Sequence, residues 1–295
     1  MKDISPLFKY NELNTASIEF FIKIFENCQG CSLTNDVFRG RSNLFKLLTG
    51  HEDLSLRRLV FVLLARICRT NSSIMIFSST NTLNFDDFLM AERLAFIELR
   101  LQLDLPPNYL ELDQNERTKE RIEHGETPKV SFTQEIGSLI NPELSAASCE
   151  LLEFLMVPLL DNEENFSDED IDKYFKNINS ILEECVAIFK AAKGKRDCQR
   201  NELKCLLSIF AKWLIEAPFL CGNKALIREI KSLVRLLWWF PREALLFIPA
   251  LQELANGNAK QDMKLGINEL GKKLNEFASD EEKIEIQKLI ETVYK

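Results

Sequence analysis

Glycine and histidine are scarce in this sequence of 295 residues. Its 10 glycines are about 3% of the chain, against an average of about 7%, which disfavours tight hairpins and phosphate-binding loops because both need positive φ angles. The only histidines are His51 and His124. This excludes a histidine-rich metal centre and leaves a Ser-His-Asp triad only two candidate bases. These shortages argue against several common kinds of enzyme site.

Long apolar runs and a cysteine framework are also absent. No uninterrupted run reaches the roughly 18 apolar residues of a membrane span, and segment 1–6 lacks the apolar core of a secretory signal. Eight cysteines are too few for a disulfide scaffold of this length. Most of them occupy apolar helical positions, where a free thiol behaves as a small buried hydrophobe: Cys68, Cys149, Cys185 and Cys205. We therefore expect an intracellular protein, cytoplasmic or nuclear, with no membrane span.

Acidic residues outnumber basic ones, 45 to 37, so the net charge is −8. Such a chain is repelled by phosphate backbones and anionic membranes unless a local basic patch overrides the average. One cluster of that kind surrounds Gly194: Lys190, Lys193, Lys195, Arg196 and Arg200. It follows a predicted helix, whose dipole favours cations at the C-terminus. The cluster is either a solvated helix end or a surface that contacts anions.

Apolar residues recur at intervals of three and four along most of the chain, which predicts helices. Ser167 and Ser279 have the sequence context of N-caps, and Pro249 predicts a kink. No alternating strand pattern bounded by Asn-Gly or Asp-Gly occurs. The predicted class is all-α, with ten or eleven helices over 18–25, 44–48, 56–67, 85–105, 141–158, 167–193, 202–215, 224–240, 241–255, 260–277 and 279–294.

One segment differs from the rest in composition. Fifteen of the seventeen residues in 113–129 are charged, Gln, Asn, Thr, Gly or Pro. Such a stretch cannot bury enough apolar surface to fold by itself. We predict N-terminal helical repeats over 1–112, a polar linker or exposed loop over 113–130, and C-terminal helical repeats over 131–295.

The order Asp-x-x-aliphatic-Arg runs from Asp53 to Arg57 and is followed by an apolar helix. Over about thirty residues this pattern resembles the turn and second helix of a HEAT or armadillo repeat. In those repeats the acid caps a helix and the arginine packs across the repeat junction. The resemblance implies stacked antiparallel helical hairpins that form an armadillo/HEAT-like superhelix.

Three motifs that resemble sites of known chemistry are incomplete. Cys28 and Cys31 form a C-x-x-C without the second ligand pair of a zinc site. The run from Gly266 matches a phosphate loop, but Lys273 replaces the required Ser or Thr, and Leu265, Leu270 and Leu274 predict a helix there. The acidic stretch 161–172 lacks the glycine turn of a calcium loop, and we interpret it as solvated or as a docking surface for a basic segment. We expect no catalytic residue, metal, cofactor or small-molecule substrate.

Trp238 and Trp239 form the most unusual local pattern. Adjacent side chains point about 100° apart on a helix, so burying both rings requires cover on two sides. Trp238 follows Val234 by four residues and is predicted to extend the buried stripe, whereas Trp239 follows Arg235 by four and is predicted to lie on the polar edge. We therefore predict that Trp238 packs in the core and that Trp239 contacts a partner.

These observations favour a non-catalytic helical-repeat adaptor or scaffold that binds partner proteins in an intracellular complex. The candidate partner-binding residues are Trp239, Arg235, Lys193, Lys195, Arg196 and Arg200. A nucleic-acid-linked helical-repeat subunit acting in DNA repair or RNA processing is the first alternative, based on the basic cluster and on Arg57, Arg58, Arg66 and Arg69. The second is an all-helical enzyme that uses His51 or His124 as a base in a site that the sequence does not reveal.

Overall fold

The computed structural model describes residues 18–20, 22–23, 54–70, 85–104, 142–160 and 166–295, and every regular element in these ranges is a helix. The all-α prediction is confirmed for this part of the chain. Outside the described residues lie the predicted helix over 44–48, Cys28 and Cys31, both histidines, Asp53, the predicted linker 113–130 and residues 161–165 of the acidic stretch. In the described ranges no helix combines the length and the apolar character that a membrane crossing needs.

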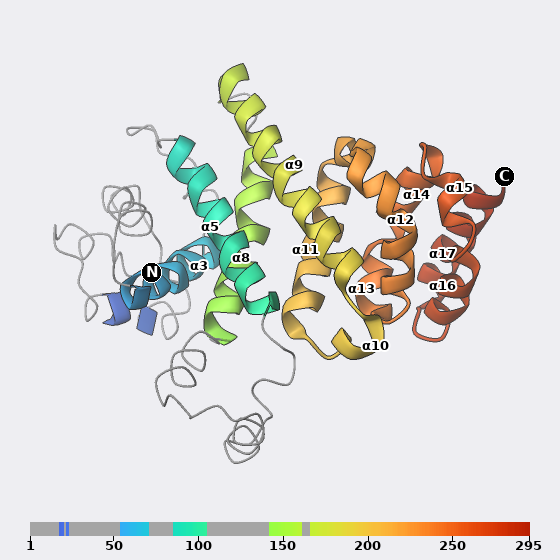
Figure 1. Ribbon diagram of the computed structural model, residues 1–295, viewed down its shortest axis with the longest axis horizontal. Coiled ribbons are helices and arrows are strands. Elements are labelled where there is room, and N and C mark those ends of the chain that lie inside the picture. The colour runs from blue at the N-terminus through green and yellow to red at the C-terminus, as the bar shows by residue number, and fades with distance from the viewer. Residues whose placement is uncertain (1–17, 21, 24–53, 71–84, 105–141, 161–165) are drawn as a thin grey trace, which may run out of the picture.

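The helices follow one another from the N-terminal to the C-terminal end of the molecule (Figure 1). Their bounds are α3 Leu54–Thr70, α5 Phe85–Asp104, α8 Pro142–Leu160, α9 Asp168–Ala191, α10 Gly194–Asp197, α11 Asn201–Glu216, the 3₁₀ helix η4 Pro218–Gly222, α12 Lys224–Leu237, α13 Pro241–Leu246, α14 Ile248–Asn256, α15 Lys260–Met263, α16 Ile267–Leu274 and α17 Asp280–Tyr294.

Two helix starts are set by the caps that the sequence predicts. The Ser167 side chain accepts a hydrogen bond from the backbone N–H of Asp170, and acidic residues fill the first turn of α9, where the helix dipole favours them. At α17, Ser279 and Glu282 form both bonds of a capping box. Side-chain chemistry close to each helix end therefore fixes where α9 and α17 begin.

The contacts between helices can be followed as two rows. In one row α5 contacts α9, α9 contacts α12, and α12 contacts α15 and α16. In the other row α3 contacts α8, α8 contacts α11, α11 contacts α13 and α14, and α14 contacts α17. Helices α3 and α5, from the predicted region 1–112, thus pack on α8, from the predicted region 131–295.

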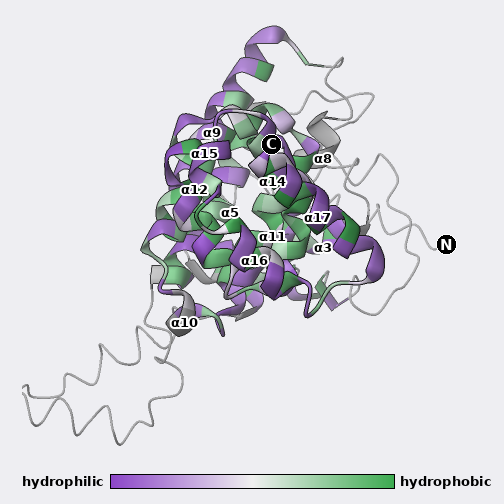
Figure 2. Cartoon of the chain, turned by 90° about the vertical axis from the view of Figure 1, so that its right-hand side faces the viewer, coloured by the Kyte–Doolittle hydropathy of each residue, from purple (hydrophilic) through white to green (hydrophobic). Residues whose placement is uncertain are grey.

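The core is formed by side chains that pack both within and between the two rows. Trp213 of α11 is buried and donates a hydrogen bond from Nε1 to the Leu152 carbonyl of α8, at 3.3 Å. On the same helix the ring of Phe210 meets Phe189 of α9 edge-on, with 5.1 Å between centroids, and approaches Phe247 at 6.1 Å. Seen from the C-terminal end, hydrophobic parts of α11 and α14 lie inside, whereas α16 and α17 present hydrophilic outer sides (Figure 2).

Three predicted helices end early or divide in the structure. The helix predicted over 224–240 ends at Leu237. The one predicted over 241–255 is interrupted at the buried Phe247, two residues before the predicted kink at Pro249. The one predicted over 260–277 is divided into α15 and α16, and Leu265 between them is 73% exposed, so it does not share a buried face with Leu270 and Leu274.

Candidate functional site

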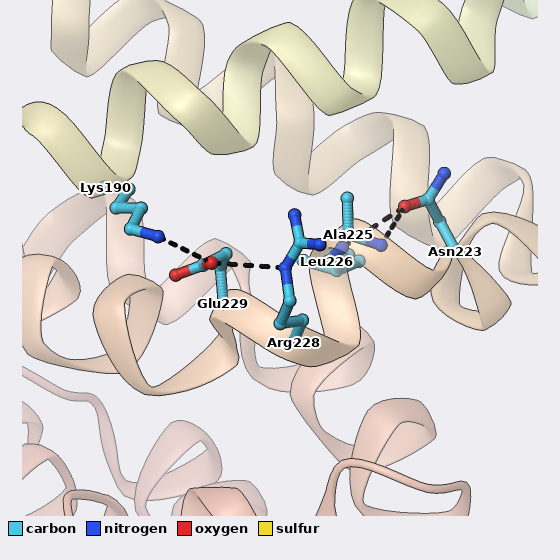
Figure 3. A network of polar contacts seen from close by, with 6 residues as sticks. All are labelled: Lys190, Asn223, Ala225, Leu226, Arg228 and Glu229. Carbon is cyan, nitrogen blue, oxygen red and sulfur yellow. Dashed lines mark hydrogen bonds and ion pairs between the residues drawn. The ribbon is translucent and has the colours of Figure 1, made fainter.

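Helix α12 is fixed at its start and middle, and it ends at the tryptophan pair. Oδ1 of Asn223 accepts hydrogen bonds from the backbone N–H groups of Ala225 and Leu226, at 2.9 and 3.2 Å. Further along α12, Glu229 pairs with Lys190 of α9 at 2.8 Å and with Arg228 at 3.3 Å (Figure 3). The hydrogen bond from Lys190 lowers the pKa of the Glu229 carboxyl, so this pair is ionised at neutral pH. The Lys190–Glu229 pair therefore joins the middle of α12 to α9.

The prediction that Trp238 packs in the core is wrong. Trp238 and Trp239 are both 38% exposed. Helix α12 ends at Leu237. Beyond it, the backbone N–H groups of Trp239 and Phe240 each donate to the carbonyl three residues earlier, that of Leu236 and that of Leu237. This tighter turn changes the phase of the side chains, so Phe240, which is 1% exposed, takes the buried place instead.

The two indoles meet edge to face, with ring centroids 4.7 Å apart and an interplanar angle of 78°. Trp239 also lies against Gly194, the first residue of α10. A methyl group built on Gly194 would lie 1.9 Å from Cδ1 of that indole, so only glycine permits this contact. Gly194 is the residue around which the predicted basic cluster is arranged, and the structure thus brings Trp239 to that cluster.

On its other side the pair continues onto α16. The Lys273 ammonium lies 5.8 Å from the centroid of Trp238 and 5.1 Å from that of Phe277, which is 52% exposed. Lys273 also pairs with Glu276 at 2.7 Å. We call Gly194, Trp239, Trp238, Lys273 and Phe277 the tryptophan surface. It joins α10, the end of α12 and the end of α16.

The other predicted partner-binding residues lie around this surface in different states. The side chains of Arg235 and Lys193 are exposed. Arg200 donates a hydrogen bond to the Gln102 carbonyl at 2.8 Å, so it ties the start of α11 to the end of α5. For Lys195 and Arg196 only the backbone is described, as part of α10. The structure therefore gives Arg200 a structural bond and leaves Arg235 and Lys193 exposed to solvent.

The run Gly266–Lys273 forms helix α16 and the residue before it, and within the described residues no strand precedes it. Helix packing explains one of the two glycines of this run, Gly271. A methyl group at this position would lie 2.7 Å from Cδ1 of Ile290, so glycine allows α16 to approach α17 closely. The motif therefore reflects helix packing, as its helical context predicts.

A second group of polar side chains lies between α5 and α9, and no motif in the sequence points to it. Glu92 is 0% exposed; its Oε2 accepts a hydrogen bond from Asn177 at 2.6 Å, whereas its Oε1 has no partner within the described part of the chain. Burial raises the pKa of Glu92 from 4.5 to about 7, although Asn177 and Arg93 lower it. Burial and the Glu92 charge raise the pKa of Tyr174, whose hydroxyl is also buried without a partner there.

Glu92 has the perturbed pKa that is typical of an acid–base catalyst. A catalyst, however, has to reach its substrate, and the Glu92 carboxyl is completely covered by packed helices. Neighbouring Arg93 and Arg100 both pair with Glu184 of α9, as Arg66 and Arg69 of α3 both pair with Glu150 of α8. These four ion pairs between arginine and glutamate therefore join α5 to α9 and α3 to α8, and their role is structural.

The cysteines behave as the sequence predicts in the positions that are described. Cys149 and Cys185 are buried and Cys205 is half-buried, all as free thiols. A hydrogen bond with Cys205 and burial raise the pKa of the Cys149 thiol, and burial raises that of Cys185, so both stay protonated and unreactive at neutral pH. Among the described residues no group of three or more His, Cys, Asp or Glu side chains is placed to bind a metal ion.

The tryptophan surface thus combines exposed aromatic rings, indole N–H groups and nearby cations, all close to helix ends. Such a combination is suited to recognition of another molecule. Comparison with family models, with curated proteins and with solved structures found no match to this chain.

Proposed function

We propose that this protein is a non-catalytic helical-repeat adaptor that binds a partner protein through the tryptophan surface. In this proposal the two rows of helices form an armadillo/HEAT-like superhelix, as the order of the helix contacts suggests. Solenoids of this kind commonly act by offering an extended surface to other proteins. The step from fold to function is made by analogy, and the surface residues supply the specific support.

One observation carries the proposal: two adjacent tryptophans remain 38% exposed although a large apolar core is available to the chain. Tryptophan and arginine are the residues that most often dominate binding energy at protein interfaces. The pair is also preorganised, because Gly194 supports Trp239 on one side and Lys273 covers Trp238 on the other. A preorganised ring loses little conformational entropy when a partner binds.

The proposal is tested by affinity purification of the full chain from cells, in parallel with the double variant Trp238→Ala and Trp239→Ala. Partners that depend on the surface should be lost from the variant, because a hot-spot side chain contributes about 2 kcal/mol or more to binding. Thermal unfolding followed by circular dichroism establishes that the variant is folded.

The matched control is Phe219→Ala with Ile284→Ala, which removes two other large side chains that are 50% and 58% exposed. This control should retain every partner that the tryptophan variant loses. If a folded tryptophan variant keeps all the partners of the wild type, the proposal is wrong.

A further inference from the structure

The charge around the tryptophan surface is opposite in sign to that of the chain as a whole. Segment 193–200 has four basic residues and one acidic, and segments 235–243 and 272–276 each have two basic and one acidic. All three meet at the tryptophan pair, because Gly194 touches Trp239 and Lys273 lies over Trp238. These three segments therefore carry a local excess of positive charge in a chain whose net charge is −8.

Three cations that face solvent here have no ion-pair partner in the described part of the chain. Lys193, Arg235 and Arg242 are exposed and form no ion pair with any described residue. The nearby carboxylates are largely occupied, since Asp197 accepts a hydrogen bond from the Lys193 backbone N–H at 2.8 Å and Glu276 pairs with Lys273. Of the three carboxylates that the described part of these segments contains, Glu243, half-buried and next to Arg242 in sequence, is the one without such a bond.

The indole N–H groups add a second polar feature. In the core, Nε1 of Trp213 donates to a backbone carbonyl. Neither Trp238 nor Trp239 donates such a bond to a described residue. Nε1 of Trp239 lies against Gly194, 2.4 Å from a methyl group built there, whereas Nε1 of Trp238 is left to donate to a carboxylate or carbonyl oxygen of a bound molecule, next to cations that favour a carboxylate.

We infer that the tryptophan surface binds an acidic peptide segment of a partner protein that contains an aromatic or aliphatic anchor residue. This inference rests on the proposed adaptor function and specifies its partner. The anchor packs against the exposed edges of Trp238, Trp239 and Phe277, and flanking Asp or Glu side chains face Lys193, Arg235 and Arg242. The exposed cations and the Trp238 indole N–H are thereby matched by a ligand of complementary charge.

The geometry favours a peptide over single-stranded nucleic acid. Stacking of a base requires an open aromatic face, but Lys273 lies over the ring of Trp238 and Gly194 lies against the ring of Trp239. A long phosphate backbone would also be repelled by the remainder of an acidic chain, whereas a short acidic segment meets only the local positive charge.

The test begins with selection of random displayed peptides of about twelve residues on the full-length protein. We expect the selected peptides to be acidic and to share an aromatic or aliphatic residue. Selection of neutral or basic peptides, or of none, overturns the inference. One selected peptide, labelled with fluorescein, then serves as the probe in fluorescence polarisation.

Two pairs of charge reversals show whether the cations contribute. Arg235→Glu with Arg242→Glu should weaken binding of the probe by at least about tenfold. Lys176→Glu with Lys224→Glu is the matched control, because both lysines are exposed and Lys224 begins α12 at the opposite end from Trp238, about 20 Å away. Equal affinity of both variants and the wild type overturns the inference.

Further measurements with the same probe distinguish failure of this inference from failure of the proposed function. A probe that loses affinity with Trp238→Ala and Trp239→Ala but not with the charge reversals leaves the adaptor function intact and refutes the acidic partner. A probe unaffected by the tryptophan substitutions refutes the proposed surface itself. Fluorescein-labelled oligothymidine that binds more tightly than the peptide, and competes with it, would assign the surface to nucleic acid instead.

Discussion

Replacing Glu92 by glutamine tests whether the buried carboxyl group of Glu92 makes the folded protein less stable as the pH rises. Glutamine has nearly the same shape, and its side-chain oxygen can still accept the hydrogen bond from Asn177. It does not titrate, so a comparison of the variant with the wild type isolates the proton of Glu92. The other titrating groups contribute equally to both proteins.

The sign and size follow from the raised pKa. Between pH 4.5 and about 7 the unfolded chain releases the Glu92 proton while the folded chain retains it, so the wild type loses stability across this range. At about 1.4 kcal/mol per pKa unit, the rise from 4.5 to about 7 corresponds to a loss of about 3 kcal/mol above pH 7. Below pH 4.5 this contribution of the protonated carboxyl is fully retained.

Urea unfolding, followed by circular dichroism at several pH values, measures this difference. The free energy of unfolding of Glu92→Gln should rise relative to the wild type by about 3 kcal/mol as the pH increases from about 4 to about 8. Glu98→Gln, which removes the same charge from a half-buried position of α5, is the matched control. If the Glu92→Gln and wild-type stabilities run parallel with pH, Glu92 is not a buried carboxyl of raised pKa.

Three further substitutions test the contacts that place the tryptophan surface. Gly194→Ala puts a methyl group where the Trp239 indole lies and should cost about 1–3 kcal/mol while shifting tryptophan emission to longer wavelength; unchanged emission would contradict the contact. Asn223→Ala removes the N-cap of α12 and should lower the free energy of urea unfolding by about 1 kcal/mol, which an unaltered midpoint would disprove. Trp213→Ala should cost about 3–5 kcal/mol and Trp239→Ala clearly less, so equal losses of melting temperature would show that both rings are core residues.

The helices that could be predicted from the sequence are those whose signals are local. In α9 the buried side chains recur at intervals of three and four, which is the spacing that predicts the helix: Tyr174, Ile178, Ile181, Leu182, Cys185, Val186 and Phe189. Its cap, Ser167, and the capping box at Ser279 are equally local, because each bonds to a backbone group within three residues. Such patterns can be recognised without knowledge of any distant part of the chain.

The features that were missed depend on contacts between distant segments. Glu92 lies between Ala91 and Arg93 in an ordinary helical pattern. It is buried because α5 packs against a distant segment that includes Asn177, 85 residues away. The side chain of Trp239 meets Gly194 across more than forty positions of sequence. The early end of α12 did have a local signal, since Pro241 disfavours a helical conformation of Phe240, whose φ is −126°.

The placement of the three tryptophans divides the optical properties of the protein into two parts. Trp213 is enclosed among apolar side chains, so its emission reports on the packing between α8 and α11. Trp238 and Trp239 are in contact with each other and with solvent, so their emission and their coupled electronic transitions report on the end of α12. A soluble quencher reaches the second group and not the first. Tryptophan fluorescence can therefore distinguish unfolding of the core from binding at the tryptophan surface, without an added label.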